Sequence, residues 1–267
     1  MTGLVATILG CGPSPGVPRV GNDWGSCDPN EPRNRRSRCG LLVEQRTVGA
    51  APTRVLVDTS PDIRGQLLDA GIDYLDGVLY THAHADHLHG IDDLRAFWMK
   101  TKRRVDVYAD KATSARILEA FEYCFRTPPG GTYPPILAMN RIEANVPFSI
   151  DGAGGAIDVA PIAQTHGPGG ASLGFRFGPL AYSCDVSALD DHAVSTLQGL
   201  DVWIVDALRR EPHPSHFSVR ESLAWIERLK PRRAILTHMD YSLDYATLKS
   251  ELPPNVEPAY DGMVIAL

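Results

Sequence analysis

Cysteine is scarce in this sequence, and no long apolar run is present. The 267 residues include five cysteines, an odd number without framework spacing, which argues against a disulfide-stapled extracellular domain. The segment from Met1 to Leu9 has no basic leader, and its apolar run is too short for a signal peptide or a membrane span. No Ser/Gly linker divides the chain. We therefore expect one cytoplasmic domain over residues 1–267, with no membrane partner. Four cysteines are expected to be small buried hydrophobes: Cys11, Cys39, Cys124 and Cys184.

Net positive charge is also lacking. The formal charge of −6 does not suit a protein that follows long nucleic acid, because such binding depends on Lys and Arg neutralising phosphates. The one basic cluster, Arg33 to Arg38, lies in a Pro-rich loop. A solvated loop is the favoured interpretation, and a phosphate clamp beside the functional site is the alternative. The glycines around Cys11 form neither a Walker loop nor a dinucleotide fingerprint, which disfavours nucleoside triphosphate chemistry.

The strongest functional signal is the run from His82 to His87, which reads HAHADH. It follows a short apolar stretch that is typical of a buried strand. Residues two apart in an extended chain point the same way, so His82 and His84 can hold one ion together. Asp86 and His87 lie past the bend, which makes two adjacent ions easier to satisfy than one. Imidazole and carboxylate donors suit zinc, manganese or iron.

Three later residues are candidate ligands because each follows a strand-like apolar run. His166 follows residues 157–165, Asp185 follows 180–184, and His238 follows 233–237. Open sheets place their ligands at such strand ends.

With this ligand order, the chain resembles the metallo-β-lactamase-fold hydrolases over nearly its whole length. The resemblance implies that His82, His84 and His166 hold one metal, that Asp86, His87 and His238 hold the other, and that Asp185 bridges them. It also implies that Asp58 supports the ligands without binding metal. The opening Leu9 to Pro18, the strand Ser172 to Phe177, Pro214-Ser-His216 and the closing Tyr260 to Ile265 are most similar to the phosphodiesterase branch. That branch includes the phosphonate-operon cyclic phosphodiesterase and ribonuclease Z.

One departure from the phosphonate-operon relative concerns its separate structural zinc. That relative holds the zinc with clustered cysteines in its early loop and a His three residues after the last metal ligand. Here the loop has Cys27 and, much later, Cys39, while the position three after His238 is Tyr241. We therefore predict no structural zinc.

The element pattern is that of an α/β fold, and we expect an αββα sandwich of the metallo-β-lactamase type in a single domain. Strands are predicted near residues 4–9, 41–45, 54–58, 77–81, 105–109, 157–162, 172–183, 202–206, 233–237 and 263–266. Helices are predicted near residues 61–70, 91–99, 112–125, 218–229 and 244–251.

These features predict a hydrolase that binds two divalent ions, zinc or manganese, with iron as a third candidate. The leading hypothesis is attack by a metal-bridged hydroxide on a small cyclic or nucleotide-derived phosphodiester. Asp86 and Asp185 act through the ions, and His216 protonates the leaving oxygen, a role suited to a side chain that titrates near neutrality. His213 is the rival for that role. Further substrate-binding candidates are His89 and Arg209. His192 is expected to be a solvated helix residue.

Two other functions remain open on the sequence. The same ligand set can hydrolyse a lactone, a thioester or a similar acyl substrate, because fold and metal site do not fix the electrophile. A metal-dependent binding protein is the non-enzymatic alternative. A homodimer is expected by analogy with relatives.

Overall fold

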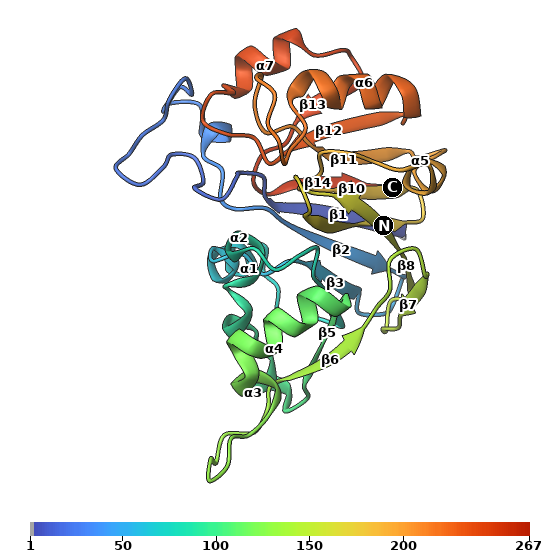
Figure 1. The fold of residues 1–267 in the computed structure, drawn as a ribbon. Coiled ribbons are helices and arrows are strands. Elements are labelled where there is room, and N and C mark those ends of the chain that lie inside the picture. The colour runs from blue at the N-terminus through green and yellow to red at the C-terminus, as the bar shows by residue number, and fades with distance from the viewer. Residues whose placement is uncertain (1–2) are drawn as a thin grey trace.

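Two seven-stranded β-sheets face each other in the computed structural model, which describes residues 3–267. Figure 1 shows the sheets as successive layers with helices outside them. The first sheet has the order β14 (Met263–Ala266), β1 (Gly3–Gly10), β2 (Gly40–Arg46), β3 (Thr53–Val57), β4 (Gly77–Leu79), β5 (Val105–Ala109) and β6 (Leu137–Arg141). The second has the order β13 (Val256–Pro258), β12 (Arg233–Thr237), β11 (Val202–Asp206), β10 (Leu180–Ser183), β9 (Ala171–Phe177), β8 (Ile157–Thr165) and β7 (Phe148–Ile150).

Helices cover the outer faces of both sheets. The first sheet carries α1 (Ile63–Asp69), α2 (Ala85–Leu88), α3 (Arg95–Thr101) and α4 (Lys111–Phe125), and the second carries α5 (Asp191–Thr196), α6 (Val219–Leu229) and α7 (Tyr245–Glu251). Two 3₁₀ turns, η1 (Pro32–Asn34) and η2 (Ile91–Leu94), complete the elements. The expected αββα sandwich is therefore confirmed. No helix within residues 3–267 combines the length and the apolar character needed to cross a bilayer.

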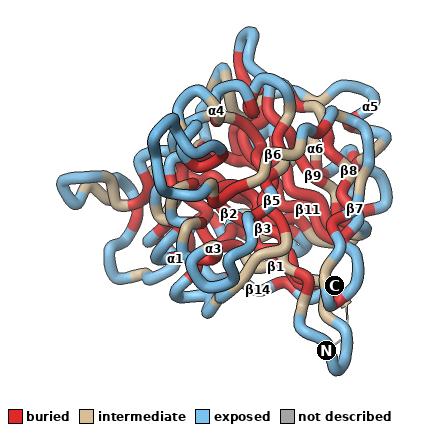
Figure 2. Tube along the Cα trace, turned by 90° about the horizontal axis from the view of Figure 1, so that it is seen from below, coloured by how far each residue is buried: buried red, intermediate tan, exposed pale blue. Residues whose placement is uncertain are grey.

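The core follows from strand geometry. Successive side chains of a strand point to opposite faces, so in β2 Leu41 and Val43 lie between the sheets while Leu42 packs beneath the helices. β11 is buried along its whole length, including Trp203, because both faces of its sheet are covered. In Figure 2 the buried segments coincide with the central strands, and the exposed segments are mostly loops. The expected burial of the four cysteines is confirmed, and Cys27 is buried as well.

The parallel strands share one edge where their carboxyl ends meet. β3 to β6 are parallel in the first sheet, and β10 to β13 are parallel in the second. Side chains that follow these strands are brought together at this edge, as in other open α/β sheets.

Some expected elements differ from those observed. The predicted strand 172–183 is a hairpin, β9 and β10, because the chain reverses at Gly178, whose φ is +54°. The predicted helix 91–99 begins as the 3₁₀ turn η2 and continues as α3 to Thr101. β6, β7, β13, α2 and α5 were not predicted, since elements of three to six residues are too short to show periodicity.

Replacing Asp244 with Ala should lower the free energy of unfolding by about 1–2 kcal/mol, the usual cost of a lost N-cap. Its carboxylate caps α7 by accepting from the Thr247 amide at 2.9 Å and also accepts from Asn34 Nδ2 at 2.7 Å. Burial opposes ionisation, but these bonds outweigh it and lower the pKa of Asp244 to about 2. The contribution is therefore present above the unfolded pKa near 4 and is lost as the pH falls through about 2. Urea unfolding at pH 7 measures the effect, and Asp191→Ala, which removes an exposed carboxylate that is not an N-cap, is the control.

Candidate metal centre

Strand ends supply most of the predicted ligands. His82 lies just after β4, His166 directly follows β8, and His238 directly follows β12. Asp185 comes two residues after β10, and Asp86 and His87 lie on α2. Asp185 and His238 have φ values of 55° and 59°, and Asp58, directly after β3, has 64°. Left-handed backbone at three non-glycine residues of one edge is the kind of strain that collects at functional sites.

The first ligand group contains His82, His84, His166 and Asp185, whose donor atoms all lie within 4.8 Å of one another. His84 Nδ1 is 2.8 Å from His82 Nε2 and 3.3 Å from His166 Nε2. Asp185 Oδ2 is 3.5 Å from both Nε2 atoms. Donor atoms about 2.1 Å from a tetrahedral cation are about 3.4 Å apart, so this group has the spacing of a metal site.

The second ligand group contains Asp86, His87 and His238, and it faces the other oxygen of the Asp185 carboxylate. Asp185 Oδ1 is 3.3 Å from His87 Nε2 and 3.3 Å from His238 Nε2. Asp86 Oδ2 is 3.4 Å from His87 Nε2 and 4.0 Å from His238 Nε2. Asp185 therefore faces one group with each oxygen, which is the arrangement expected of a bridging ligand. The thiol of Cys184 also borders this group and donates to Asp185 Oδ1 at 3.0 Å.

The electrostatics of the second group also fit a cation. His87 Nε2 and His238 Nε2 are buried and have no hydrogen-bond partner among residues 3–267. Burial opposes protonation of both imidazoles, but the surrounding acidic groups, Asp185 foremost, together outweigh it, raising the pKa of His87 and bringing that of His238 to about 10. Burial likewise opposes ionisation of Asp86, yet His238 and His87 lower the pKa of that carboxyl. Positive charge is thus stabilised between these side chains, and a divalent cation fits there.

Asp58 orients one histidine of each ligand group through hydrogen bonds. Its Oδ2 lies 2.7 Å from His87 Nδ1 and accepts from Thr81 Oγ1 at 2.8 Å, and that hydroxyl lies 2.9 Å from His82 Nδ1. The Thr81 amide donates to Asp58 Oδ1 at 2.8 Å. One buried carboxylate therefore orients an imidazole of each group.

Replacing Asp58 with Asn should weaken metal binding and activity about 10- to 100-fold, the usual cost of losing an outer hydrogen-bond partner of a ligand. An amide keeps the shape of the side chain but carries no charge to orient His87. Chelator competition and steady-state kinetics measure the effect. Asp62→Asn, which changes a neighbouring carboxylate outside the centre, is the matched control. Unchanged metal affinity in the Asp58 variant would contradict the supporting role.

His216 lies beside both groups and is held by a carboxylate that the sequence did not reveal. Its Nδ1 is 2.8 Å from Asp206 Oδ2, and its ring centroid is 4.6 Å from that of His238 and 4.9 Å from that of His166. The side chain is 11% exposed, so solvent or a substrate can reach it. Asp206 is the last residue of β11, at the same edge where the candidate ligands follow their strands, and that position was the signal that should have identified it.

The remaining predicted residues are placed less centrally. His213 is partly buried beside His216, with ring centroids 5.1 Å apart. His89 is the C-cap of α2; it is exposed, and its ring packs against Phe121 of α4. The Arg209 guanidinium donates to the carbonyls of Glu211 and Pro212 in its own loop. As expected, His192 is exposed on α5.

The solvated-loop interpretation of the Arg33 to Arg38 cluster holds for Arg33 and Arg35, which are exposed, but not for Arg36, which is buried. Arg33 pairs with Glu31, Arg38 pairs with Asp62, and Arg36 is buried against backbone carbonyls. Within this cluster, Arg35 alone is exposed and forms no ion pair with the residues that the structure describes. The cluster is therefore mainly structural, because its guanidinium groups are already occupied by protein acceptors.

Comparisons with known proteins agree with this geometry. A model of the beta-lactamase superfamily domain matches residues 53–239. The crystal structure of a diphosphatase from the PhnP family is 33% identical, with a TM-score of 0.87 and coverage of 99% of this chain and 98% of that one. An octanoyltransferase of Porphyromonas gingivalis (strain ATCC BAA-308 / W83) is 33% identical over 266 residues, which are 96% of this chain and 50% of that protein. A ribonuclease Z of Bradyrhizobium sp. (strain ORS 278) is 38% identical over 78 residues, which are 28% of this chain and 24% of that protein.

The chain spans about half the length of the first of these curated relatives and about a quarter of the second. The superfamily model covers more than half of this chain, and the diphosphatase matches it from end to end. The chain therefore belongs to the beta-lactamase superfamily of metallo-β-lactamase-fold hydrolases and, within its phosphodiesterase branch, to the PhnP family.

Proposed function

We propose that this hydrolase uses two divalent cations to cleave a small phosphodiester, either cyclic or nucleotide-derived. The observation that carries the proposal is the Asp206–His216 pair, which lies against both ligand groups and can protonate a leaving oxygen. The likeness to a PhnP-family diphosphatase supports phosphoryl chemistry and adds a diphosphate linkage to the substrates worth testing. The net charge of −6 favours a small substrate over long nucleic acid.

In this proposal His82, His84 and His166 hold one cation, Asp86, His87 and His238 hold the other, and Asp185 contacts both. Nitrogen and oxygen donors of this kind accept zinc or manganese, and cellular supply decides between them. When bound, the cations lower the pKa of water and stabilise charge that develops on the phosphoryl oxygens. Two cations outweigh the two carboxylates Asp86 and Asp185, so the site attracts an anionic substrate.

The protein side chains then control the protons. His166 Nδ1 lies 2.8 Å from the Ser215 carbonyl and must donate to it, which leaves Nε2 free to bind a cation. Asp206 accepts from His216 Nδ1 in the same way, so His216 Nε2 can hold the transferable proton. His216 passes this proton to the leaving oxygen as the bond to phosphorus breaks, and Asp206 stabilises the imidazolium beforehand.

Hydrolysis of an acyl substrate is the second candidate, and the orientation of Arg209 favours it. The Arg209 guanidinium is engaged by the carbonyls of its own loop, so it is not directed at a substrate phosphate. A lactone or thioester needs no guanidinium clamp, because its carbonyl is neutral until it is attacked. The relative named octanoyltransferase makes thioesters natural members of the comparison.

A substrate panel tests the proposed function. The protein, reconstituted separately with Zn²⁺ and Mn²⁺, is assayed on bis(p-nitrophenyl) phosphate, 2′,3′-cyclic nucleotides, a dinucleoside diphosphate, a lactone and an acyl thioester. We expect turnover of the phosphoryl substrates and its loss on treatment with a chelator. Turnover of the lactone or thioester alone would replace the proposal with the acyl hydrolase.

A further inference from the structure

Arg36 is a buried cation without a counter-ion. Arg36 is only 1% exposed, yet unlike Arg33 and Arg38 it forms no ion pair within residues 3–267. Its guanidinium donates instead to neutral oxygens, at 2.9 Å to the Asp240 carbonyl and at 2.6 Å to the Leu243 carbonyl. Burying a charge is costly unless its hydrogen bonds are well satisfied, so these carbonyls are what keep Arg36 in place.

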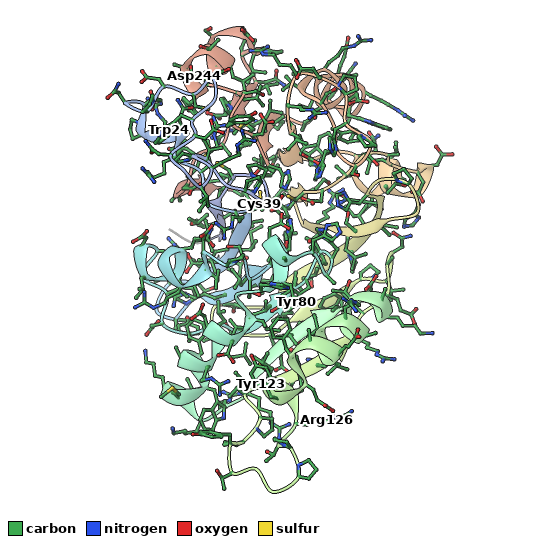
Figure 3. The ribbon with its side chains drawn as sticks, turned by 60° about the vertical axis from the view of Figure 1, so that its left-hand side comes forward. Trp24, Cys39, Tyr80, Tyr123, Arg126 and Asp244 are labelled. Carbon is green, nitrogen blue, oxygen red and sulfur yellow. The ribbon has the colours of Figure 1, made fainter. Side chains whose placement is uncertain are left out.

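The carbonyls belong to the segment 239–243, which directly follows His238. This segment has no regular secondary structure of its own, and the early loop secures it at several points. The Met239 amide donates to the Cys11 carbonyl at 3.0 Å, and the Ser26 amide donates to the Tyr241 carbonyl at 2.9 Å. In Figure 3 Trp24 of the early loop and Asp244 at the start of α7 lie in the same part of the molecule. Arg36 adds a buried side-chain attachment to these backbone hydrogen bonds.

A second observation shows why this segment matters for His238. In His82, His87 and His166 the nitrogen turned away from the ligand group is within 2.9 Å of a protein hydrogen-bond partner. His238 Nδ1 has no such partner within residues 3–267, because the nearest carboxylate oxygen, Asp206 Oδ1, is 3.8 Å away. That distance is too long for a hydrogen bond. Apart from this longer contact with Asp206, the ring of His238 is oriented by its backbone and by stacking on His216.

We propose that Arg36 is the positioning residue for His238 and thereby sets cation affinity at the second ligand group alone. The left-handed backbone of His238, with φ of 59°, leads directly into the carbonyls that Arg36 holds. The first group does not depend on this segment, because His82, His84 and His166 come from other strand ends. This inference rests on the proposed binuclear centre and adds to it a residue more than 200 positions away in the sequence from the ligand it positions.

Zn²⁺ binding by Arg36→Met tests the inference. Methionine fills similar volume but donates no hydrogen bond. Arg36→Lys keeps the charge with a single donor group that cannot span both carbonyls, and exposed Arg35→Met is the matched control. For each protein, mass spectrometry of dialysed samples gives the Zn²⁺ content, and titration against a chromophoric chelator gives two affinities. Hydrogen exchange of the amides of residues 239–243 gives a readout that is independent of metal.

In Arg36→Met we expect one of the two Zn²⁺ affinities to fall about 10- to 100-fold and the other to stay within about threefold of wild type. Arg36→Lys should be intermediate, Arg35→Met should match wild type, and exchange should rise in 239–243 only in the Arg36 variants. Wild-type affinities at both positions in Arg36→Met overturn the inference alone. Equal weakening at both positions in Arg36→Lys does so too, and this criterion holds even when Arg36→Met fails to fold. A wild-type protein that takes up fewer than two Zn²⁺ overturns the proposed centre together with the inference.

Discussion

Replacement of Asp185 by Asn should lower kcat/KM by about a thousandfold or more and should reduce the metal content of the purified protein. The two oxygens of Asp185 face different ligand groups, at 3.5 Å from His82 Nε2 and 3.3 Å from His238 Nε2. An amide removes the charge and turns an NH₂ group toward one set of imidazoles. Cations contribute several kcal/mol to such reactions, and each 1.36 kcal/mol corresponds to a tenfold change in rate.

Metal analysis and kinetics on the best phosphoryl substrate measure this result side by side. Asp191→Asn removes a carboxylate on the exposed end of α5 and should leave both quantities unchanged. An Asp185→Asn protein that binds two cations and retains more than a tenth of wild-type activity would show that the shared carboxylate is not needed.

Replacement of His216 by Ala should produce the second largest effect, and its size should depend on the leaving group. General acid catalysis is worth about 10²- to 10⁴-fold, so a substrate with an alkoxide leaving group should lose that much in kcat. A p-nitrophenyl ester should lose far less, because p-nitrophenolate leaves without a proton. The position of His216 between the Asp206 carboxylate and both ligand groups is the basis of this expectation.

A comparison of two substrates with the same phosphate and different leaving groups measures the effect. His192→Ala, which changes an exposed histidine of α5, is the matched control and should behave as wild type. Asp206→Asn should reproduce part of the loss, because it removes the acceptor that fixes the His216 tautomer. Equal losses for both leaving groups would exclude His216 as the acid and leave His213 as the candidate for that role.

The sequence predicted that the candidate ligands would lie close together because their signals are local. A few residues are enough to recognise an apolar strand that is followed by a histidine or an aspartate. The structure brings His82, His166, Asp185 and His238 together from such positions. The longer helices were also predicted from a local pattern, because an apolar stripe repeats over three or four turns. It did not detect the short strands or the turn at Gly178, where too few residues carry a pattern.

The orientation of side chains across the two sheets was decided by the tertiary structure alone. Asp206 reads in the sequence as the end of a buried strand, and its contact with His216 depends on how the loop before α6 folds back. Arg36 reads as part of a basic loop, yet it is buried against a segment 204 residues later. Residue type and spacing thus determined which groups meet at the carboxyl edge of the sheets. Which oxygen of Asp185 faces which imidazole, and which cation is buried rather than solvated, depended on long-range packing that no local pattern encodes.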